Sequence, residues 1–264
     1  MKIALGLEYD GRPFSGFQSQ VGQTTVQDAL ETALGTIAAA PVRVHCAGRT
    51  DTGVHAAVQV VHFETDAVRP LTAWVRGVNA TLPKSISVNW AVEPEPAFHA
   101  RFLAQARGYR YVLLNRPVRP GMLAGRVGWF HRPLDADKMA TAAAKLVGKH
   151  DFSSFRAAAC QAKSPVKYLY TASVERRGDF IVFEFRANAF LHHMVRNMVG
   201  ALVTIGKGEQ RPEWMAELLE LGDRRYAAPT FTPDGLYLSM IEYPDGFGLP
   251  NGGLIEATME DCWP

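Results

Sequence analysis

The sequence is poor in cysteine and has no long apolar run. Its three cysteines, Cys46, Cys160 and Cys262, lie far apart and are odd in number, so they form neither a disulfide framework nor a CxxC metal or redox motif. No stretch approaches the roughly 20 apolar residues of a membrane span, and the start MKIALGLEYD alternates like a strand rather than like a signal peptide. We therefore expect a soluble cytoplasmic protein in a reducing compartment, with no membrane partner.

The motifs that bind nucleotides or catalytic metals are also missing. The sequence has no P-loop, no GxGxxG after a strand, no HExxH and no cysteine cluster. With 264 residues and 47% hydrophobic side chains, the chain can nevertheless bury one large core or two of ordinary size. We expect a globular protein that works without a metal, a nucleotide or any other cofactor.

Acidic residues are missing from the most basic part of the chain. The net charge is +2, but six acids and no Lys or Arg lie beyond Arg225, so residues 1–225 carry 28 basic and 20 acidic residues, a net charge of +8. Residues 96–134 contain no carboxylate and seven arginines: Arg101, Arg107, Arg110, Arg116, Arg119, Arg126 and Arg132. Tyr109, Tyr111, Trp129 and Phe130 lie among them. Such a stretch suits a phosphate backbone and unstacked bases, although a solvated face opposite aromatic core residues has the same pattern.

One order of strands and helices occurs twice along the chain. Apolar alternation and the Thr25/Asp28 capping pattern predict strands at 2–10, 42–47, 58–64 and 86–92 and helices at 25–39 and 70–80. The second half has predicted strands at 109–114, 167–176, 180–187 and 236–243, helices at 135–147 and 190–205, and an extra helix at 212–221. Both halves have the order βαββαβ, which is the ferredoxin-like motif with its helices on one face of an antiparallel sheet.

The repeat predicts the fold class and the domains. We expect an α+β protein of two ferredoxin-like halves side by side, with mainly antiparallel sheets and a basic cleft between them. The expected domains are residues 1–100, residues 101–247 and a flexible tail at 248–264, because Gly, Pro and acidic residues accumulate beyond Pro244. RNA-binding domains use open sheets as platforms, but the fold alone implies no function.

The segment Ala47–His55 interrupts two apolar strands with polar residues. Its sequence AGRTDTGVH places Asp51 two residues after Arg49 and between two glycines. A loop of this kind can hold a carboxylate at the edge of a cleft, although a polar β-turn would use Asp and Gly for backbone reasons alone. Asp51-Thr52-Gly53 is also the aspartic-protease tripeptide, but that chemistry needs two carboxylates sharing a proton, and this chain has one such tripeptide.

Five further segments complete a family pattern. They are LEYDG at 7–11, FHARF at 98–102, RGYRY at 107–111, DFSSF at 151–155 and NAFLHHMVRNMVG at 188–200. Together with GRTDTGVH at 48–55, and in this order, they resemble the TruA family of pseudouridine synthases over residues 2–243. The chain departs from the pattern at Thr52, where alanine is more usual, and at Gly108 beside the tyrosine motif; neither departure touches the chemistry that the resemblance implies.

The resemblance implies roles for individual residues. Asp51 corresponds to the catalytic nucleophile, Tyr109 to the tyrosine that packs against the target base, and Arg196 to the basic residue paired with the aspartate. From spacing alone, Tyr109 could equally belong to a strand core, and Arg196 could be a surface residue of an amphipathic helix. Arg49 resembles the arginine that holds the flipped-out nucleotide. The residues expected to bind the substrate are Arg49, Tyr109, His55, Arg101 and Arg110.

His192 and His193 fall within the helix predicted at 190–205. Because neighbouring helical residues point about 100° apart, the two imidazoles would face different sides of the helix. We therefore expect no paired metal site here, and at least one imidazole that packs or contacts phosphate.

The resemblance also implies an activity. It is the isomerisation of uridines 38, 39 and 40 in the anticodon arm of transfer RNA to pseudouridine, by a homodimer, without a cofactor. A nearby arginine would lower the pKa of Asp51 and keep it ionised, but residue types do not distinguish attack at C1′, addition at C6 or elimination to a glycal. The alternatives are a non-catalytic RNA-binding protein on the same scaffold and a hydrolase of the aspartic type.

Overall fold

The computed structural model describes residues 1–257; residues 258–264, which include Cys262 and the end of the expected tail, lie outside the description. Contacts divide the chain into two compact units, one of residues 1–107 with the segment that begins at Tyr237, the other of residues 108–236. No helix within residues 1–257 is long and apolar enough to cross a membrane.

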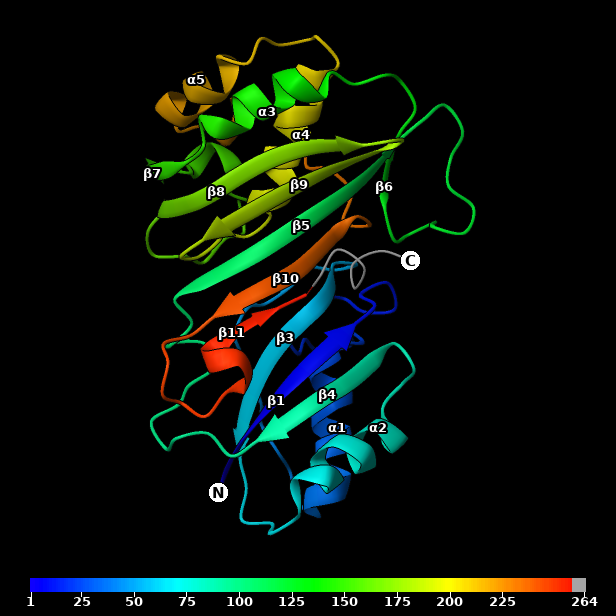
Figure 1. The fold of residues 1–264 in the computed structure, drawn as a ribbon, viewed down its shortest axis with the longest axis vertical. Coiled ribbons are helices and arrows are strands. Elements are labelled where there is room, and N and C mark those ends of the chain that lie inside the picture. Colours follow the sequence, from blue (N-terminus) through cyan, green and yellow to red (C-terminus); the bar gives the residue numbers. More distant parts are fainter. Residues whose placement is uncertain (258–264) are drawn as a thin grey trace. The chain divides into compact units, whose positions relative to one another are not determined.

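The first unit contains a mostly antiparallel sheet (Figure 1). Its central strand β1 (Lys2–Tyr9) pairs antiparallel with β3 (His55–Glu64) on one side and β4 (Ile86–Val92) on the other. A short strand β2 (His45–Cys46) pairs with β3. The segment between β2 and β3 contains the Asp51 motif, so both of its ends are fixed in one sheet.

The last part of the described chain extends the same sheet. β10 (Leu236–Glu242) runs parallel to β3, with Tyr237 opposite His55, and β11 (Leu254–Glu256) pairs antiparallel with β10. The domains expected at 1–100 and 101–247 divide the chain at the repeat in the sequence. The compact units instead group residues from Tyr237 onward with residues 1–107, because β10 pairs with β3. The structure also differs from the expected tail at 248–264, because its described part forms β11 and a 3₁₀ turn, η4 (Pro250–Gly253).

Two helical segments cover one face of this sheet (Figure 1). They are α1 (Val26–Ala38) and α2 (Val78–Thr81), and a π-helical turn η1 (Ala73–Gly77) leads into α2. Alternate residues of β1 and successive turns of α1 are fully buried in this layer: Ile3, Leu5, Leu7, Leu30 and Leu34. The apolar alternation in the sequence therefore predicts this core correctly.

The second unit contains strands in the order β5, β9, β8, β7 (Figure 1). Their bounds are Ala106–Asn115 for β5, Phe180–Ala187 for β9, Val166–Arg177 for β8 and Gly148–Asp151 for β7. β9 and β8 are antiparallel, as are β8 and β7, while a short strand β6 (Gly128–Phe130) runs parallel to β5. The unit is thus also mainly antiparallel.

Three helices of the second unit lie on one face of its sheet (Figure 1). They are α3 (Ala136–Ala144), α4 (Met194–Gly206) and α5 (Trp214–Leu221). Asp135 caps α3, because its Oδ1 accepts the N–H of Lys138 at 3.0 Å. Two 3₁₀ turns complete the unit, η2 (Ser153–Phe155) and η3 (Arg224–Tyr226).

The α+β class with mainly antiparallel sheets is confirmed, and the basic cleft remains a prediction. The strands β6, β7 and β11 were not predicted, because three or four residues are too few to show an alternation. The helix predicted at 190–205 begins only at Met194, since the preceding His193 has φ +62°, a left-handed conformation outside a right-handed helix.

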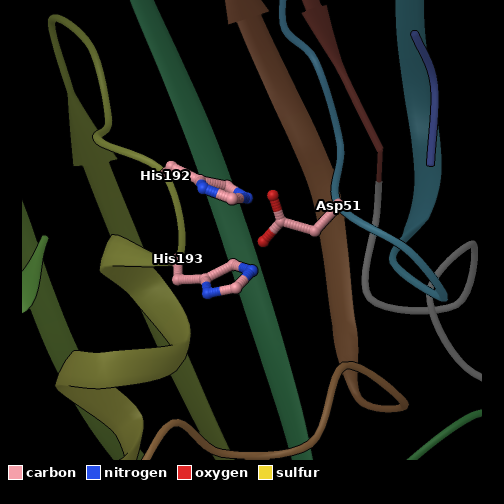
Figure 2. A group of neighbouring side chains, drawn as sticks. All are labelled: Asp51, His192 and His193. Carbon is pink, nitrogen blue, oxygen red and sulfur yellow. The ribbon is translucent and has the colours of Figure 1, made fainter. Parts of the chain in front are cut away.

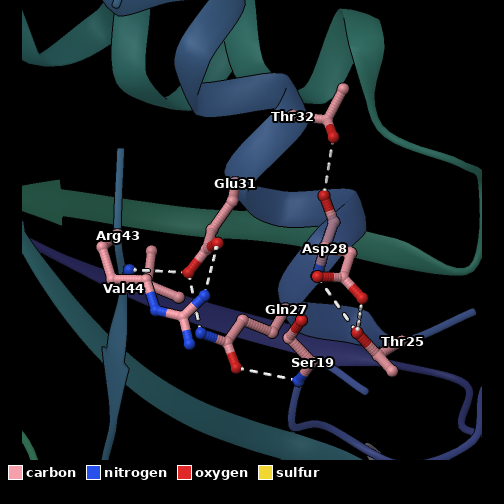
Figure 3. Close-up of polar contacts among 8 residues, drawn as sticks. All are labelled: Ser19, Thr25, Gln27, Asp28, Glu31, Thr32, Arg43 and Val44. Carbon is pink, nitrogen blue, oxygen red and sulfur yellow. Dashed lines mark hydrogen bonds and ion pairs between the residues drawn. The ribbon is translucent and has the colours of Figure 1, made fainter. Parts of the chain in front are cut away.

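Side chains at the start of α1 cap the helix (Figure 3). Oγ1 of the fully buried Thr25 accepts the N–H of Asp28 at 3.2 Å and donates to Asp28 Oδ2 at 2.5 Å. Thr32, one turn later, donates instead to the backbone oxygen of Asp28 at 2.8 Å. Thr25 therefore satisfies a helix-end N–H that would otherwise lose a partner on burial.

Side chains of α1 also form hydrogen bonds with the segments before and after the helix (Figure 3). Gln27 accepts the backbone N–H of Ser19 at 3.0 Å and donates to Glu31 at 2.7 Å. Glu31 in turn accepts the backbone N–H of Val44 at 3.0 Å and pairs with Arg43 at 3.3 Å. These bonds fix the segment that enters β2, and with it one end of the Asp51 motif.

We expect Thr25→Ala to lower the free energy of unfolding by about 1 kcal/mol, because it removes the cap. Urea denaturation of the full chain measures this change. Thr32→Ala is the matched control, since the exposed Thr32 hydroxyl bonds a carbonyl that the helix already uses, and we expect a change within about 0.5 kcal/mol. Equal effects of the two substitutions would contradict the cap.

Candidate functional site

Asp51 lies half-buried in the turn that precedes β3 (Figure 2). The N–H of Val54 donates to the backbone oxygen of Asp51 at 3.1 Å and closes the turn. The N–H of Gly53 donates to the backbone oxygen of Phe14 at 3.3 Å, which ties the turn to a neighbouring loop. The backbone around the carboxylate is therefore held from within and from outside.

Thr50, the residue before Asp51, is buried and bonded through both its side chain and its backbone. The hydroxyl groups of Tyr9 and Thr50 are 2.8 Å apart and share a hydrogen bond, and the N–H of Phe17 donates to the Thr50 oxygen at 3.1 Å. Burial raises the pKa of Tyr9 far above its ordinary value, although its bonds with Thr50 and Gln59 oppose the shift. Tyr9 is consequently a neutral anchor for the turn.

Gln59 holds the beginning of the motif. Its side chain is fully buried on β3, donates to the oxygen of Gly48 at 2.6 Å and accepts the N–H of Gly48 at 3.4 Å. Arg107 donates to the oxygen of Ala47 at 2.9 Å and 3.2 Å, and also to the oxygens of Arg101 and Ala104. Sequence reasoning missed Gln59, whose only signal was a polar residue inside an apolar strand, and placed Arg107 among basic residues facing RNA.

Gly16 allows a neighbouring loop to approach the turn. Its φ is +88°, and a Cβ at this position would lie 2.8 Å from the oxygen of Thr50 and 3.2 Å from the carbonyl carbon of Asp51. A side chain would thus both strain the backbone and push against the residues that hold the carboxylate.

His55 closes the motif as a buried ring. Its Nδ1 accepts the N–H of Gly11 at 3.1 Å and lies 3.3 Å from Oδ1 of Asp10, and the ring stacks on Tyr237 with centroids 4.7 Å apart. Nδ1 carries no proton while it accepts from Gly11, so protonation would exchange that bond for an ion pair with Asp10. Burial raises the pKa of Asp10, but the hydrogen bonds from Arg12 outweigh it and the net direction is downward.

Two exposed arginines, Arg49 and Arg101, belong to the first unit. Nδ1 of His99 accepts the N–H of Arg101 at 3.2 Å and so fixes the turn that carries it. Burial raises the pKa of the Cys46 thiol to about 11, and the positive charges of Arg49, Arg101 and Arg107 oppose that shift. The structure therefore brings Arg49 and Arg101 near the buried thiol of Cys46. This thiol lies on the segment that leads to Asp51.

Three histidines of this unit contact one another. The ring centroid of His62 lies 5.1 Å from that of His45 and 4.5 Å from that of His99, and Nδ1 of His62 accepts the N–H of Ala100 at 3.2 Å. Burial lowers the pKa of His62 from 6.5 to about 4, helped by the charges of His99, His45 and Lys2. His62 is therefore mostly neutral in the folded protein above about pH 4.

Tyr109 and Arg110 lie on β5 in the second unit. Tyr109 is 9% exposed and packs edge-to-face on Phe190, with centroids 5.0 Å apart. Arg110 is 8% exposed and pairs with Glu184 at 2.8 Å. Because a carboxylate already compensates its charge, Arg110 has the least attraction left for phosphate among the arginines expected to bind the substrate.

Arg196 lies in the first turn of α4. Its Nε donates to the oxygen of Phe231 at 2.8 Å, and the N–H of Phe231 donates back to the oxygen of Arg196 at 3.2 Å. The loop carrying Phe231 packs closely on α4, since a Cβ on Gly200 would lie 2.3 Å from the oxygen of Pro229. These contacts fix the direction of the guanidinium.

Asn197, beside Arg196, was not predicted as part of the site. It is fully buried, donates to the oxygen of Phe155 at 2.7 Å, and accepts from the hydroxyl of Thr230 at 2.7 Å and from Arg224 at 3.2 Å. It therefore links α4 to the loop that orients Arg196. The signal in the sequence was an asparagine within the apolar face of a helix.

The prediction that His192 and His193 face different sides of a helix is wrong. Both precede α4 (Figure 2), and their ring centroids are 4.0 Å apart. The left-handed His193 turns the chain, so the angle between helical neighbours does not apply. The N–H of His192 donates to Sγ of Cys160 at 3.4 Å. The argument against a paired metal site that rested on helix geometry therefore no longer holds.

Comparison with known proteins identifies relatives along nearly the whole chain. The sequence model of a family described as tRNA pseudouridine synthase matches residues 7–102 and 142–244. A protein named tRNA pseudouridine synthase A from Aromatoleum aromaticum is 61% identical over 255 residues, 97% of this chain and 97% of the relative. Proteins of the same name from Dechloromonas aromatica and Burkholderia ambifaria are 59% and 55% identical, over 95% and 100% of this chain and 96% and 97% of their own lengths.

We expect Gly16→Ala to lower the free energy of unfolding by more than about 1 kcal/mol, because the left-handed backbone and the contact with Thr50 both resist a side chain. Gly22→Ala is the matched control, since Gly22 also has a positive φ, +75°, but no neighbouring atom lies within 4 Å of the place that its Cβ would take. Urea denaturation of both variants isolates the contact. A cost for Gly16→Ala no greater than that for Gly22→Ala would contradict it.

The lowered pKa of His62 predicts a pH-dependent stability. Because its pKa is about 4 when folded and 6.5 ordinarily, the unfolded chain binds the proton more strongly. Stability is therefore fully present above pH 6.5 and declines as the pH falls towards 4. Thermal melts between about pH 7 and 5 should show a smaller decline for His62→Asn, which keeps an acceptor for Ala100, than for the wild type.

His131→Asn, on an exposed residue of the second unit, controls for removing a histidine and should follow the wild type. A wild-type Tm that does not fall between pH 7 and 5, or a His62→Asn profile parallel to it, would show that His62 does not carry the effect.

Proposed function

Because the chain belongs to the tRNA pseudouridine synthase family, we propose that it isomerises uridines 38, 39 and 40 of the anticodon arm, with Asp51 as the nucleophile. Family membership makes the protein an isomerase that acts on transfer RNA, as the motifs in its sequence predicted. The target positions and the roles of single residues are the proposal.

The observation that carries the proposal is the anchored turn around Asp51. Tyr9, Gln59 and Arg107 hold the residues on its N-terminal side, and the exposed Arg49 lies within the same motif. A turn whose backbone is this strongly bonded can present one half-buried carboxylate at a fixed position, which covalent and electrostatic catalysis require. An RNA-binding protein without activity would need the arginines but not the aspartate.

The reaction sets three requirements. The bond from C1′ to N1 breaks, a bond from C1′ to C5 forms, C5 loses a proton and N1 gains one, so no atom is added or lost. A carboxylate near the sugar, a ring that holds the detached base and a group that removes the C5 proton meet these requirements. We assign the first to Asp51 and the second to Tyr109.

Arg196 is assigned the positive charge paired with Asp51 at the reacting uridine. The bond from its Nε to Phe231 fixes the guanidinium direction, so the charge can be delivered at one place. The proposal requires Asp51, Tyr109 and Arg196 to act on the same uridine. Extruding that uridine costs a few kcal/mol, which stacking on Tyr109, about 1 to 3 kcal/mol per base, offsets in large part.

The remaining residues that were predicted to bind the substrate have different proposed roles. Arg49 and Arg101 are exposed and suit phosphate or an extruded nucleotide. His55 is 2% exposed and Arg110 is paired with Glu184, so their contribution is to hold the site rather than to meet RNA directly. We further propose that the protein is a cytoplasmic homodimer. Sedimentation equilibrium would measure the mass of the assembly.

Asp51→Asn should remove turnover and leave binding of transfer RNA within about tenfold, or about 1.4 kcal/mol. Asn keeps the shape and a hydrogen-bonding oxygen, whereas the charge and the nucleophile are lost. Release of tritium from transfer RNA labelled at C5 of uridine measures turnover. Asp66→Asn, on an exposed aspartate of the same unit, is the matched control and should retain full activity.

Arg196→Met extends the same test, because it removes the charge while keeping much of the side-chain volume. It should cut turnover by orders of magnitude, and the double variant should be little worse than the slower single variant, since groups that act as a unit are not additive. Near-normal tritium release from Asp51→Asn would refute the proposed role. RNA binding without tritium release from the wild type would favour the non-catalytic alternative.

A further inference from the structure

Two tyrosines of β8 are exposed side by side on the second unit. Tyr168 is 45% exposed and Tyr170 is 40% exposed, and their ring centroids are 5.0 Å apart with planes tilted by 42°. Leu169 between them is fully buried. Because side chains alternate along a strand, both tyrosines lie on the face of β8 that is turned away from the buried layer.

Tyr170 lies at a β-bulge. Leu169 is opposite Ala187 and Thr171 is opposite Arg186, so the pairing shifts by one residue at Tyr170. A bulge leaves the extra residue unpaired and re-aims its side chain. Here it places the ring of Tyr170 under Arg186, whose guanidinium carbon lies 5.0 Å from the ring centroid.

Cations flank the two rings. Lys149 of β7 is directly opposite Tyr168 and is exposed, and Arg186 of β9 covers Tyr170. The carboxylate of Glu184, on the same face of β9 as Arg186, is paired with Arg110. The four residues Lys149, Tyr168, Tyr170 and Arg186, here called the tyrosine platform, thus cross three strands and carry two positive charges.

We propose that the tyrosine platform binds unstacked bases of the transfer RNA, with Tyr168 and Tyr170 stacking on the bases and Lys149 and Arg186 contacting the adjacent phosphates. Nucleic acid fits better than a protein partner, because exposed rings alternating with cations match a chain that alternates bases with phosphates. The inference rests on transfer RNA as the substrate and not on the role of Asp51.

The role is one of affinity, so it is separable from catalysis. None of the four residues belongs to the motifs assigned to the reaction. Loss of the rings should therefore raise Kd and KM for transfer RNA and leave kcat at saturating RNA unchanged. This division also separates the two proposals, since Asp51→Asn should change kcat and leave binding nearly intact.

The decisive variants replace both tyrosines at once. Tyr168→Leu with Tyr170→Leu keeps apolar volume but removes the rings, and should weaken binding of an unmodified transfer-RNA transcript about tenfold, or about 1.4 kcal/mol. Tyr168→Phe with Tyr170→Phe keeps the rings and should stay within about twofold of the wild type. Tyr226→Leu, on a tyrosine of η3 that is 60% exposed, is the matched control and should also bind normally. Fluorescence anisotropy gives Kd, and tritium release gives KM and kcat.

Equal affinities of the leucine variant and the wild type, or equal losses in the leucine and phenylalanine variants, would overturn the inference. A changed sedimentation mass of the leucine variant without RNA would also overturn it, because the face would then be an interface between copies. A wild type that binds RNA but releases no tritium would refute the proposed function. The affinities of the leucine and phenylalanine variants would still test the tyrosine platform.

Photo-crosslinking provides a second measurement that needs no variant. Transfer RNA with 5-bromouridine in place of uridine is irradiated with the wild-type protein, and crosslinked peptides are identified by mass spectrometry. We expect crosslinks at Tyr168 or Tyr170. Crosslinks confined to other residues would overturn the inference, whatever the folding of the leucine variant.

Discussion

The buried amide of Gln59 is the constraint on which the Asp51 turn depends. It lies in the middle of β3, yet both of its bonds to Gly48 go to the backbone of the motif. A buried amide that lost these partners would cost about 1 to 3 kcal/mol, so the turn and the strand stabilise each other. Tyr9 extends the same coupling to β1. The carboxylate of Asp51 is thus positioned by the core of the first unit as well as by its own turn.

The second unit solves a similar problem by packing a loop on a helix. The backbones of Arg196 and Phe231 are bonded to each other, and the absence of a side chain at Gly200 lets the loop approach. Asn197 then secures the helix on its buried side. In both units, a fully buried amide holds the structure near a residue proposed for the chemistry: Gln59 bonds Gly48, three residues before Asp51, and Asn197 follows Arg196. Because the two amides order the backbone from within the core, the site itself loses little flexibility.

Arginine has two different functions in this chain. Arg107 bonds three backbone oxygens and Arg110 pairs with Glu184, so both belong to the internal architecture. Arg49 and Arg101 are exposed, and their charges remain accessible to a polyanion. The planar guanidinium with five donors suits either use. The basic character of residues 96–134 is therefore a poor measure of RNA contact until burial and partners are known.

Sequence alone determined the family, the α+β class and most helices and strands, because motif order and apolar period are local properties of the chain. It also identified Asp51, Tyr109 and Arg196 as the residues to test. Tertiary structure decided what depends on distant partners: the pairing of β10 with β3, the anchoring by Gln59, and the bulge at Tyr170. The error at His193 has the same origin, since a single left-handed residue delays the start of a helix that the apolar pattern predicts from residue 190.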